Sequence, residues 1–386
     1  MLWGKCDSLN VTENRYKKGK VVWGKSVQTL LNEMRIDKDF DVKETIGKDD
    51  VAWIHRRTSD ADIYFVSNQK NQQVNYNCIF RTEGKIPELW NAETAATSDA
   101  AIWKNENKRT TVLLNLKPLE SVFVVFRRPS KNSDPVASFN AKADSSAFLE
   151  AAGGHLYLHA RKNGDFEIAT RSNKKYTSKV TNLPQPIEVA GSWTVSFPPN
   201  WGAPSKIEFP KLISWTEHSD KGVNYFSGTA TYSNTFHIPA EMVGENKLVK
   251  LDLGEVKNFA GISINSKEVG LLWKTPFVID ITNYVVVGEN HIDIKITNTW
   301  ANRMIGDEQE PPDVDYQKST YKGVPELYNG VSMLKFPEWF INGEQRPSKG
   351  RYTFSTYNNY RKENIPLPSG LLGPVRIVNE ARIEIY

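Results

Sequence analysis

The sequence predicts a mainly β protein, in which a short α/β segment precedes a β-sandwich and then a jelly roll. After about residue 50, short runs of alternating apolar and polar residues recur between Asn, Asp, Gly and Pro. That pattern is typical of antiparallel strands with one buried face. The 386 residues include 11 Trp, 15 Tyr and 17 Phe, and aromatic side chains favour strands and fill sandwich cores. A chain of this length has room for two or three domains.

The composition also excludes several classes of function. Lys and Arg number 49 against 45 Asp and Glu, a formal net charge of +4, without the clustered basic excess of a nucleic-acid-binding protein. No apolar run is long enough to span a membrane, and the first residues lack the apolar core of a signal peptide. Two cysteines, Cys6 and Cys78, form neither a disulfide framework nor a cysteine-based zinc site.

Residues 1–47 differ in pattern from the rest of the chain. A short apolar strand is predicted over 19–25, and a helix with Ser26 as its N-cap is predicted over 26–36. Apolar side chains recur there at i, i+3, i+4 and i+7, at Val27, Leu30, Leu31 and Met34. One strand and one helix cannot bury their own apolar faces. We therefore interpret the segment as the remnant of an α/β domain; the alternative is an appendage packed on the next domain.

The β-sandwich is predicted over residues 48–128 and the jelly roll over 146–386, with a polar, proline-containing linker at 129–145. The sandwich strands are expected at 51–58, 61–68, 74–80, 109–116 and 121–126. In the jelly roll, strands are expected at 191–197, 248–256, 260–270 and 291–298. Asn163-Gly164 within 155–172 predicts a tight hairpin turn between two further strands.

A more specific pattern lies in residues 222–298. In order along the chain stand GVNYFSGTATYSNTFHIP, LDLGEV, ISINSKEVG, TPFVIDITNYV and GENHIDIKITN. This order resembles the sugar-binding jelly-roll domain of family 2 glycoside hydrolases, although Ser266 stands where that family usually carries a hairpin glycine. The resemblance implies a galactose-binding-like jelly roll and a carbohydrate partner.

A second resemblance covers essentially the whole chain. It rests on segments such as WIHRRTSDADIYFVSNQ (53–69), IPELWNAETA (86–95), TNTWANRMIGDEQEPP (297–312) and LPSGLLGPVRI (367–377). They are similar to the region that follows the catalytic barrel in glycoside hydrolase family 106, the α-L-rhamnosidase type. The resemblance implies that the catalytic carboxylates belong to an N-terminal (β/α)-barrel that this chain lacks, so no residue here receives a catalytic role. It also implies a periplasmic or secreted protein.

The segment NTWANR (298–303) best fits a sugar site. Trp300 offers a stacking face for a sugar ring, and Asn302 and Arg303 offer hydrogen-bond donors. The alternative is that Trp300 packs in the core or an interface and that Arg303 pairs with Asp307. Further substrate-binding candidates are Trp273 and Trp215.

Residues 305–315 are predicted to form an acidic loop that contains two prolines, and such a loop could bind a cation. A cation is the only cofactor that the sequence suggests. Calcium takes six to eight oxygen ligands, and Asp307 and Glu308 are the candidate ligands. The spacing does not match an EF-hand, and solvated loop carboxylates are the alternative.

These observations predict the C-terminal, non-catalytic part of an α-L-rhamnosidase-like glycoside hydrolase that acts on rhamnose-containing plant polysaccharide. Its partner is the missing catalytic barrel, and the chain alone is expected to be inactive. One alternative is a standalone carbohydrate-binding or structural adaptor module. Another is an enzyme whose site is completed by a second chain.

Overall fold

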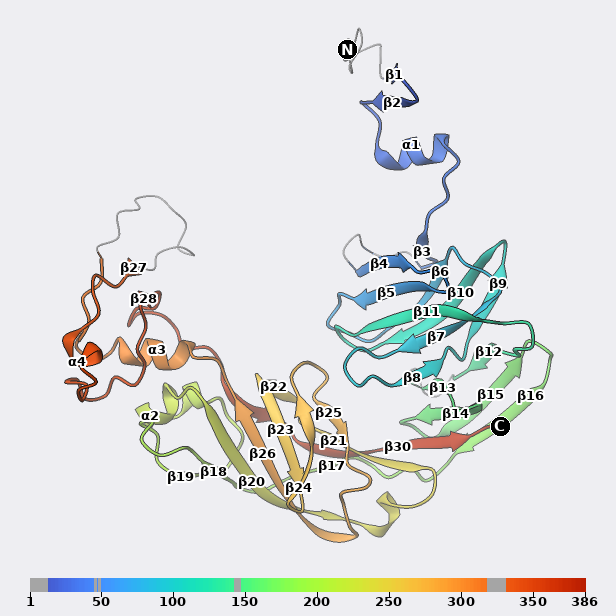
Figure 1. Ribbon diagram of the computed structural model, residues 1–386. Coiled ribbons are helices and arrows are strands. Elements are labelled where there is room, and N and C mark those ends of the chain that lie inside the picture. Colours follow the sequence, from blue (N-terminus) through green and yellow to red (C-terminus); the bar gives the residue numbers. More distant parts are fainter. Residues whose placement is uncertain (1–12, 45–46, 48–49, 142–146, 318–330) are drawn as a thin grey trace. The chain divides into compact units, whose positions relative to one another are not determined.

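The computed structural model describes residues 13–44, 47, 50–141, 147–317 and 331–386 (Figure 1). The prediction of a mainly β protein is confirmed, with antiparallel sheets throughout. Two compact units are present. The first comprises Met1–Gln69, Gln73–Leu116 and Glu120–Ala137, and the second Lys70–Gln72, Lys117–Leu119 and Ser138–Tyr386. In the described part of the chain, no helix is both long and apolar enough to cross a membrane.

The first unit begins with a hairpin of β1 (Glu13–Tyr16) and β2 (Gly19–Val22), followed by α1 (Val27–Glu33). The Ser26 side chain accepts a hydrogen bond from the Thr29 backbone N–H at 3.1 Å, so the predicted N-cap is confirmed. The helix is shorter than predicted because Arg35 takes a positive φ of 56°, which a continuing helix does not allow.

Two sheets pack against each other in the rest of the first unit. One has the order β3 (Phe40–Val42), β6 (Val74–Phe80), β10 (Arg109–Leu116) and β9 (Trp103–Glu106). The other has the order β8 (Thr97–Asp99), β7 (Lys85–Trp90), β11 (Ser121–Pro129), β5 (Asp62–Asn68) and β4 (Val51–Arg57). Their inward side chains form one core, which includes Tyr64, Phe80, Leu114 and Phe126.

The second unit contains a six-stranded sheet, whose buried side chains contribute much of the largest hydrophobic core. Its order is β19 (Lys206–Phe209), β18 (Trp193–Ser196), β20 (Thr229–Ile238), β26 (Gly288–Thr297), β23 (Phe259–Ile264) and β24 (Lys267–Leu272). Alternate side chains such as Ile292, Ile294 and Ile296 are fully buried, as the period of two predicts. They pack against the strands of a second sheet, including Val249, Leu251 and Ile377.

That second sheet is assembled from distant parts of the sequence. Its order is β25 (Val278–Asp280), β21 (Lys247–Asp252), β30 (Arg376–Glu384), β14 (His155–Ala160) and β13 (Phe148–Ala152), and β17 (Ile187–Glu188) also pairs with β30. Two smaller sheets complete this part of the fold. One is three-stranded and consists of β12 (Val136–Asn140), β15 (Gly164–Thr170) and β16 (Lys175–Val180). The other is the pair of β22 (Glu255–Lys257) and β29 (Gly370–Gly373).

The predicted hairpin at Asn163-Gly164 is wrong. Strand β14 pairs with β13 and β30, whereas β15 pairs with β16, so the two strands lie in different sheets. The Asn163 side chain instead accepts a hydrogen bond from the Leu183 backbone N–H at 2.9 Å. Pairing with the C-terminal strand prevails over the local turn signal, because β14 buries Leu156 and Leu158 in that position.

Candidate functional site

The predicted sugar-binding segment lies where β26 ends and α3 (Ala301–Asp307) begins. The chain then leaves the jelly roll and returns to it at β29. Asn302 fixes the returning segment, because its side chain donates to the Leu367 carbonyl at 2.8 Å and accepts from the Leu367 backbone N–H at 2.8 Å. It also donates to Ser369 Oγ at 2.9 Å. Asn302 is only 1% exposed. Its amide group therefore has a structural role, which is to join the start of α3 to the segment that contains Leu367 and Ser369.

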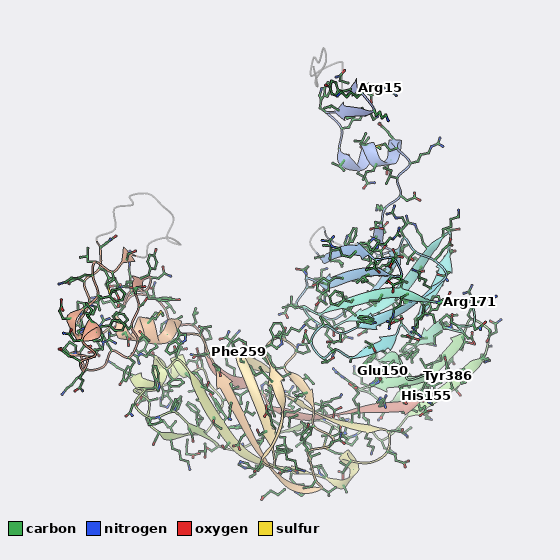
Figure 2. All side chains as sticks on the ribbon, in the orientation of Figure 1. Arg15, Glu150, His155, Arg171, Phe259 and Tyr386 are labelled. Carbon is green, nitrogen blue, oxygen red and sulfur yellow. The ribbon has the colours of Figure 1, made fainter. Side chains whose placement is uncertain are left out.

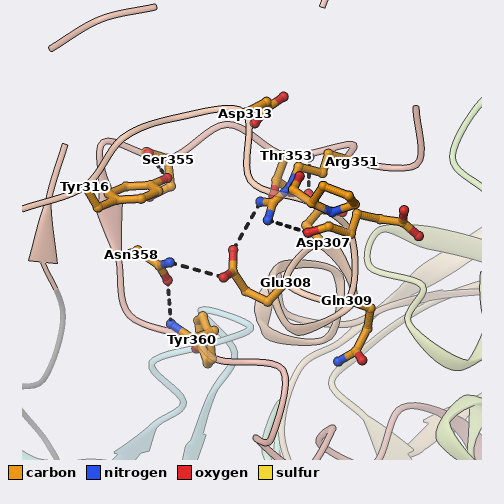
Figure 3. Close-up of polar contacts among 12 residues, drawn as sticks. Asp307, Glu308, Gln309, Asp313, Tyr316, Arg351, Thr353, Ser355, Asn358 and Tyr360 are labelled. Carbon is orange, nitrogen blue, oxygen red and sulfur yellow. Dashed lines mark hydrogen bonds and ion pairs between the residues drawn. The ribbon is translucent and has the colours of Figure 1, made fainter. Parts of the chain in front are cut away.

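Asp307 forms a buried ion pair with Arg303, and Figure 3 shows Asp307 beside Thr353. Arg303 Nε donates to Asp307 Oδ1 at 2.9 Å, and both side chains are buried. The other carboxylate oxygen accepts from the Thr353 backbone N–H at 2.7 Å and from Thr353 Oγ1 at 2.6 Å, and the Tyr352 N–H lies 3.1 Å from both oxygens. Arg303 thus forms the pair with Asp307 that the four-residue spacing allows.

Two further arginines form ion pairs within the segment between α3 and β29. Arg351 Nη1 donates to Glu308 at 3.1 Å, and Asn358 Nδ2 donates to the other Glu308 oxygen at 3.3 Å (Figure 3). Arg346 donates to Asp313 through two nitrogens, at 2.5 and 3.0 Å. Burial raises the pKa of Asp313, but the hydrogen bonds from Arg346 and Ser348 outweigh it and hold that pKa below its usual value.

A pocket of about 30 Å³ lies between these groups. Its lining includes Glu308, Tyr316, Arg351, Asn358 and Tyr360. This volume holds a water molecule or a single hydroxyl group and is too small for a sugar ring.

Three aromatic side chains, two of them exposed and one partly buried, form a cluster beside this ion-pair network. The ring centres of Trp201 and Trp300 are 5.5 Å apart at 55°, and those of Trp201 and Tyr352 are 6.3 Å apart at 28°. Trp300 is 50% exposed and Tyr352 is 36% exposed. The Arg303 guanidinium lies 4.9 Å from the centre of the Tyr352 ring. We call Trp201, Trp300 and Tyr352 the aromatic cluster; its exposed rings are suited to stack on the C–H face of a sugar.

Sequence reasoning found Trp300 and missed the other two members of the cluster. Trp201 lies in a loop rich in Pro and Gly, FPPNWGAP, where an aromatic side chain is not needed by a strand. This sequence context could have identified Trp201 as a candidate. Tyr352 had none, since only the fold brings the segment after Arg351 next to Gly202, whose added Cβ would lie 3.1 Å from the Tyr352 ring.

The remaining predicted substrate-binding residues are placed differently. Arg303 is buried, and its guanidinium is used within the protein. Trp215 is fully buried in the core and donates its indole N–H to Tyr232 Oη at 2.6 Å. Trp273 is 53% exposed and follows β24 at the edge of the six-stranded sheet. Only Trp300 and Trp273 of the predicted residues thus present a ring to solvent.

The calcium candidates Asp307 and Glu308 are both occupied by nitrogen donors. Within the described ranges, no three His, Cys, Asp or Glu side chains converge as a metal site requires. A calcium ion needs six to eight oxygen ligands, and the arginines at these carboxylates leave no place for one. We therefore propose no metal site here.

Comparisons with known proteins confirm both resemblances inferred from the sequence. Residues 1–104 match the α-L-rhamnosidase family, glycoside hydrolase family 106. Residues 173–337 match the sugar-binding domain of glycosyl hydrolases family 2. The chain is therefore related to glycoside hydrolases, and its second unit contains a sugar-binding jelly-roll domain.

Two individual relatives agree with this assignment. A rhamnosidase structure from Novosphingobium sp. PP1Y is 27% identical, with a TM-score of 0.63, over 98% of this chain and 28% of that one. A putative β-glucuronidase from Formosa agariphila is 26% identical over 92% of this chain and 45% of its own length. The chain thus spans less than half the length of either relative.

Proposed function

We propose that this chain is the C-terminal, non-catalytic part of an α-L-rhamnosidase-like glycoside hydrolase, and that it binds rhamnose-containing plant polysaccharide through the aromatic cluster. The observation that carries the proposal is a group of neighbouring aromatic rings, two of them exposed, on a domain that matches a sugar-binding family. We further propose a (β/α)-barrel catalytic partner and, from the family resemblance, a periplasmic or secreted location.

The accessory role is supported by the state of the carboxylates near the cluster. Glycoside hydrolysis requires one carboxyl group to donate a proton and a second to act as nucleophile or base. Asp307 is buried under Arg303 and Thr353, and Glu308 is paired with Arg351. Both carboxylates are thus bonded to groups of the protein itself. These residues therefore support a structural role, and the chain alone is expected not to hydrolyse glycosides.

The binding mode follows from the exposed rings. A sugar that stacks on Trp300 buries apolar C–H surface against the indole, while Trp201, tilted at 55°, borders it on a second side. Such a shallow site gives an affinity of about a millimolar, because few hydrogen bonds are added to the stacking. Loss of the Trp300 ring removes most of the contact area, so binding should weaken by about tenfold or more.

The test is calorimetric titration with rhamnogalacturonan oligosaccharides. The wild-type chain should bind in the millimolar range, and Trp300→Ala should bind at least about tenfold more weakly. The matched control is Trp53→Ala, which removes a tryptophan of the first unit that is 42% exposed; its affinity should equal that of the wild type. A wild-type chain that binds no oligosaccharide up to millimolar concentrations would overturn the binding role. Release of chromophore from an aryl α-L-rhamnoside by the purified chain would overturn the non-catalytic role.

A further inference from the structure

The outer face of the six-stranded sheet has a composition unlike that of an ordinary solvated surface. Directly paired residues point to the same face of a sheet, and Ala260, paired with Ile296, is buried. The neighbouring pair of Phe259 and Thr297 therefore points outward, as does the pair of Gly261 and Lys295. These four residues thus belong to the outer face of the sheet.

Exposed apolar side chains border this face at its β24 edge. Leu271 pairs with Gly261 and is 62% exposed. Phe259, labelled in Figure 2, is 41% exposed at the start of β23. Trp273 is 53% exposed and directly follows β24. Leu271 and Trp273 thus lie at the β24 edge of the sheet, and Phe259 lies one strand further in.

Gly261 leaves a hollow inside this border. A Cβ added there would have only the Lys295 Cβ nearby, at 3.7 Å, and the glycine does not have a positive φ. Neither the backbone nor the packing thus requires glycine at this position. Because a strand gains from a larger side chain, the missing side chain is best explained by something that occupies the space above it.

The side of the hollow away from β24 is polar. Lys295 is exposed and takes part in no ion pair among the residues that the structure describes. Beyond it, Thr297 and Thr229 bond to each other through their hydroxyl groups at 2.8 Å. The nearest carboxylate along β26, Asp293, is held by Ser233 and His291. Lys295 thus faces Leu271 across Gly261, and Thr297 is the direct partner of Phe259.

We infer that this outer face is a second sugar-binding surface, which takes an acidic sugar with its ring over Gly261 and its carboxylate at Lys295. The exposed side chains of Leu271 and Phe259 beside Gly261 suit the C–H face of the sugar, and the ammonium group of Lys295 suits its charge. The inference rests on the proposed function, because it assigns the ligand as an acidic oligosaccharide. Trp300 is three residues beyond Thr297, a chain distance of about 10 Å at most. One oligosaccharide can therefore span both surfaces.

The test compares two ligands and three variants by calorimetry. The ligands are an oligosaccharide of alternating rhamnose and galacturonic acid and the same oligosaccharide after reduction of its carboxyl groups. Lys295→Ala removes the charge, and Gly261→Val fills the hollow with a residue that strands favour. The control, Lys211→Ala, removes an exposed lysine that follows β19 at the opposite edge of the sheet.

The wild-type chain and Lys211→Ala should bind the acidic ligand about two- to fivefold more tightly than the reduced one, the range of an exposed ion pair, and added salt should remove the difference. Lys295→Ala should show no preference, and Gly261→Val should bind both ligands several-fold more weakly, with an unchanged circular dichroism spectrum. Equal affinity of the wild type for both ligands, or unchanged binding by Gly261→Val, would refute this inference. In either case a loss of binding in Trp300→Ala would leave the proposed function standing, whereas the failure of the wild type to bind either ligand would refute both.

Discussion

Replacement of Asp307 by alanine should release the segment that supports the aromatic cluster. The substitution leaves Arg303 as an unpaired buried cation and removes the acceptor of the Tyr352 and Thr353 backbone N–H groups. Breaking a buried ion pair from one side costs about 3–5 kcal/mol. At 1.36 kcal/mol per factor of ten, the equilibrium for local opening rises by roughly 100- to 5,000-fold.

Hydrogen–deuterium exchange measures this opening at the amides of Tyr352 and Thr353. Asp307→Asn keeps an acceptor but loses the charge, so its exchange should be intermediate. Glu310→Ala is the matched control, since Glu310 is an exposed carboxylate of the same loop and such substitutions change stability by about 0.5 kcal/mol or less. An increase of less than about tenfold in Asp307→Ala, or one matched by the control, would show that the ion pair does not hold this segment.

Two further predictions concern stability. Although burial raises the pKa of Glu380, hydrogen bonding to His159 and the charge of Lys250 lower it to about 2; the stabilisation is therefore full above the unfolded value of 4.5 and is lost as pH falls toward 2. Acid unfolding should show this fall in the wild type, and the same fall in His159→Gln would contradict it. In Gly306→Ala, the new Cβ would lie 2.5 Å from the Tyr225 Cβ, so urea unfolding should show a loss of about 1–3 kcal/mol. In Gly261→Ala, the new Cβ would have only the Lys295 Cβ near it, at 3.7 Å, so no stability should be lost. Equal stability of the two variants would exclude the overlap.

The strands and the first helix could be predicted because their signals are local. Residues 74–80 and 109–116 form strands with the predicted bounds, since alternation of period two within seven or eight residues already defines a buried face. The hairpin at Asn163-Gly164 failed because β13 and β30 occupy the two sides of β14, and β30 is more than 200 residues away. A turn dipeptide carries no information about such a competitor.

The candidate site was harder to predict for the same reason. The residues of NTWANR are neighbours in sequence, but their roles divide: Trp300 is exposed, while Asn302 and Arg303 are buried and bonded to the returning segment. Sequence alone gives all three the chemistry to bind sugar. Trp215 shows the converse, because its polar surroundings, SWTEHSD, suggest a loop, yet Tyr232 and the core enclose it.

The buried donors and the exposed ring in this segment have complementary roles. Trp300 occupies the N-cap position of α3 without a capping hydrogen bond from its side chain, so local bonding does not fix the indole. Its backbone is fixed instead by Asn302 on one side of the returning chain and by the Arg303–Asp307 pair on the other. A side chain on a fixed backbone has less conformational entropy to lose when a sugar stacks on it. Loosening the Asp307 contacts should therefore weaken sugar binding although Asp307 itself is too deeply buried to touch the ligand.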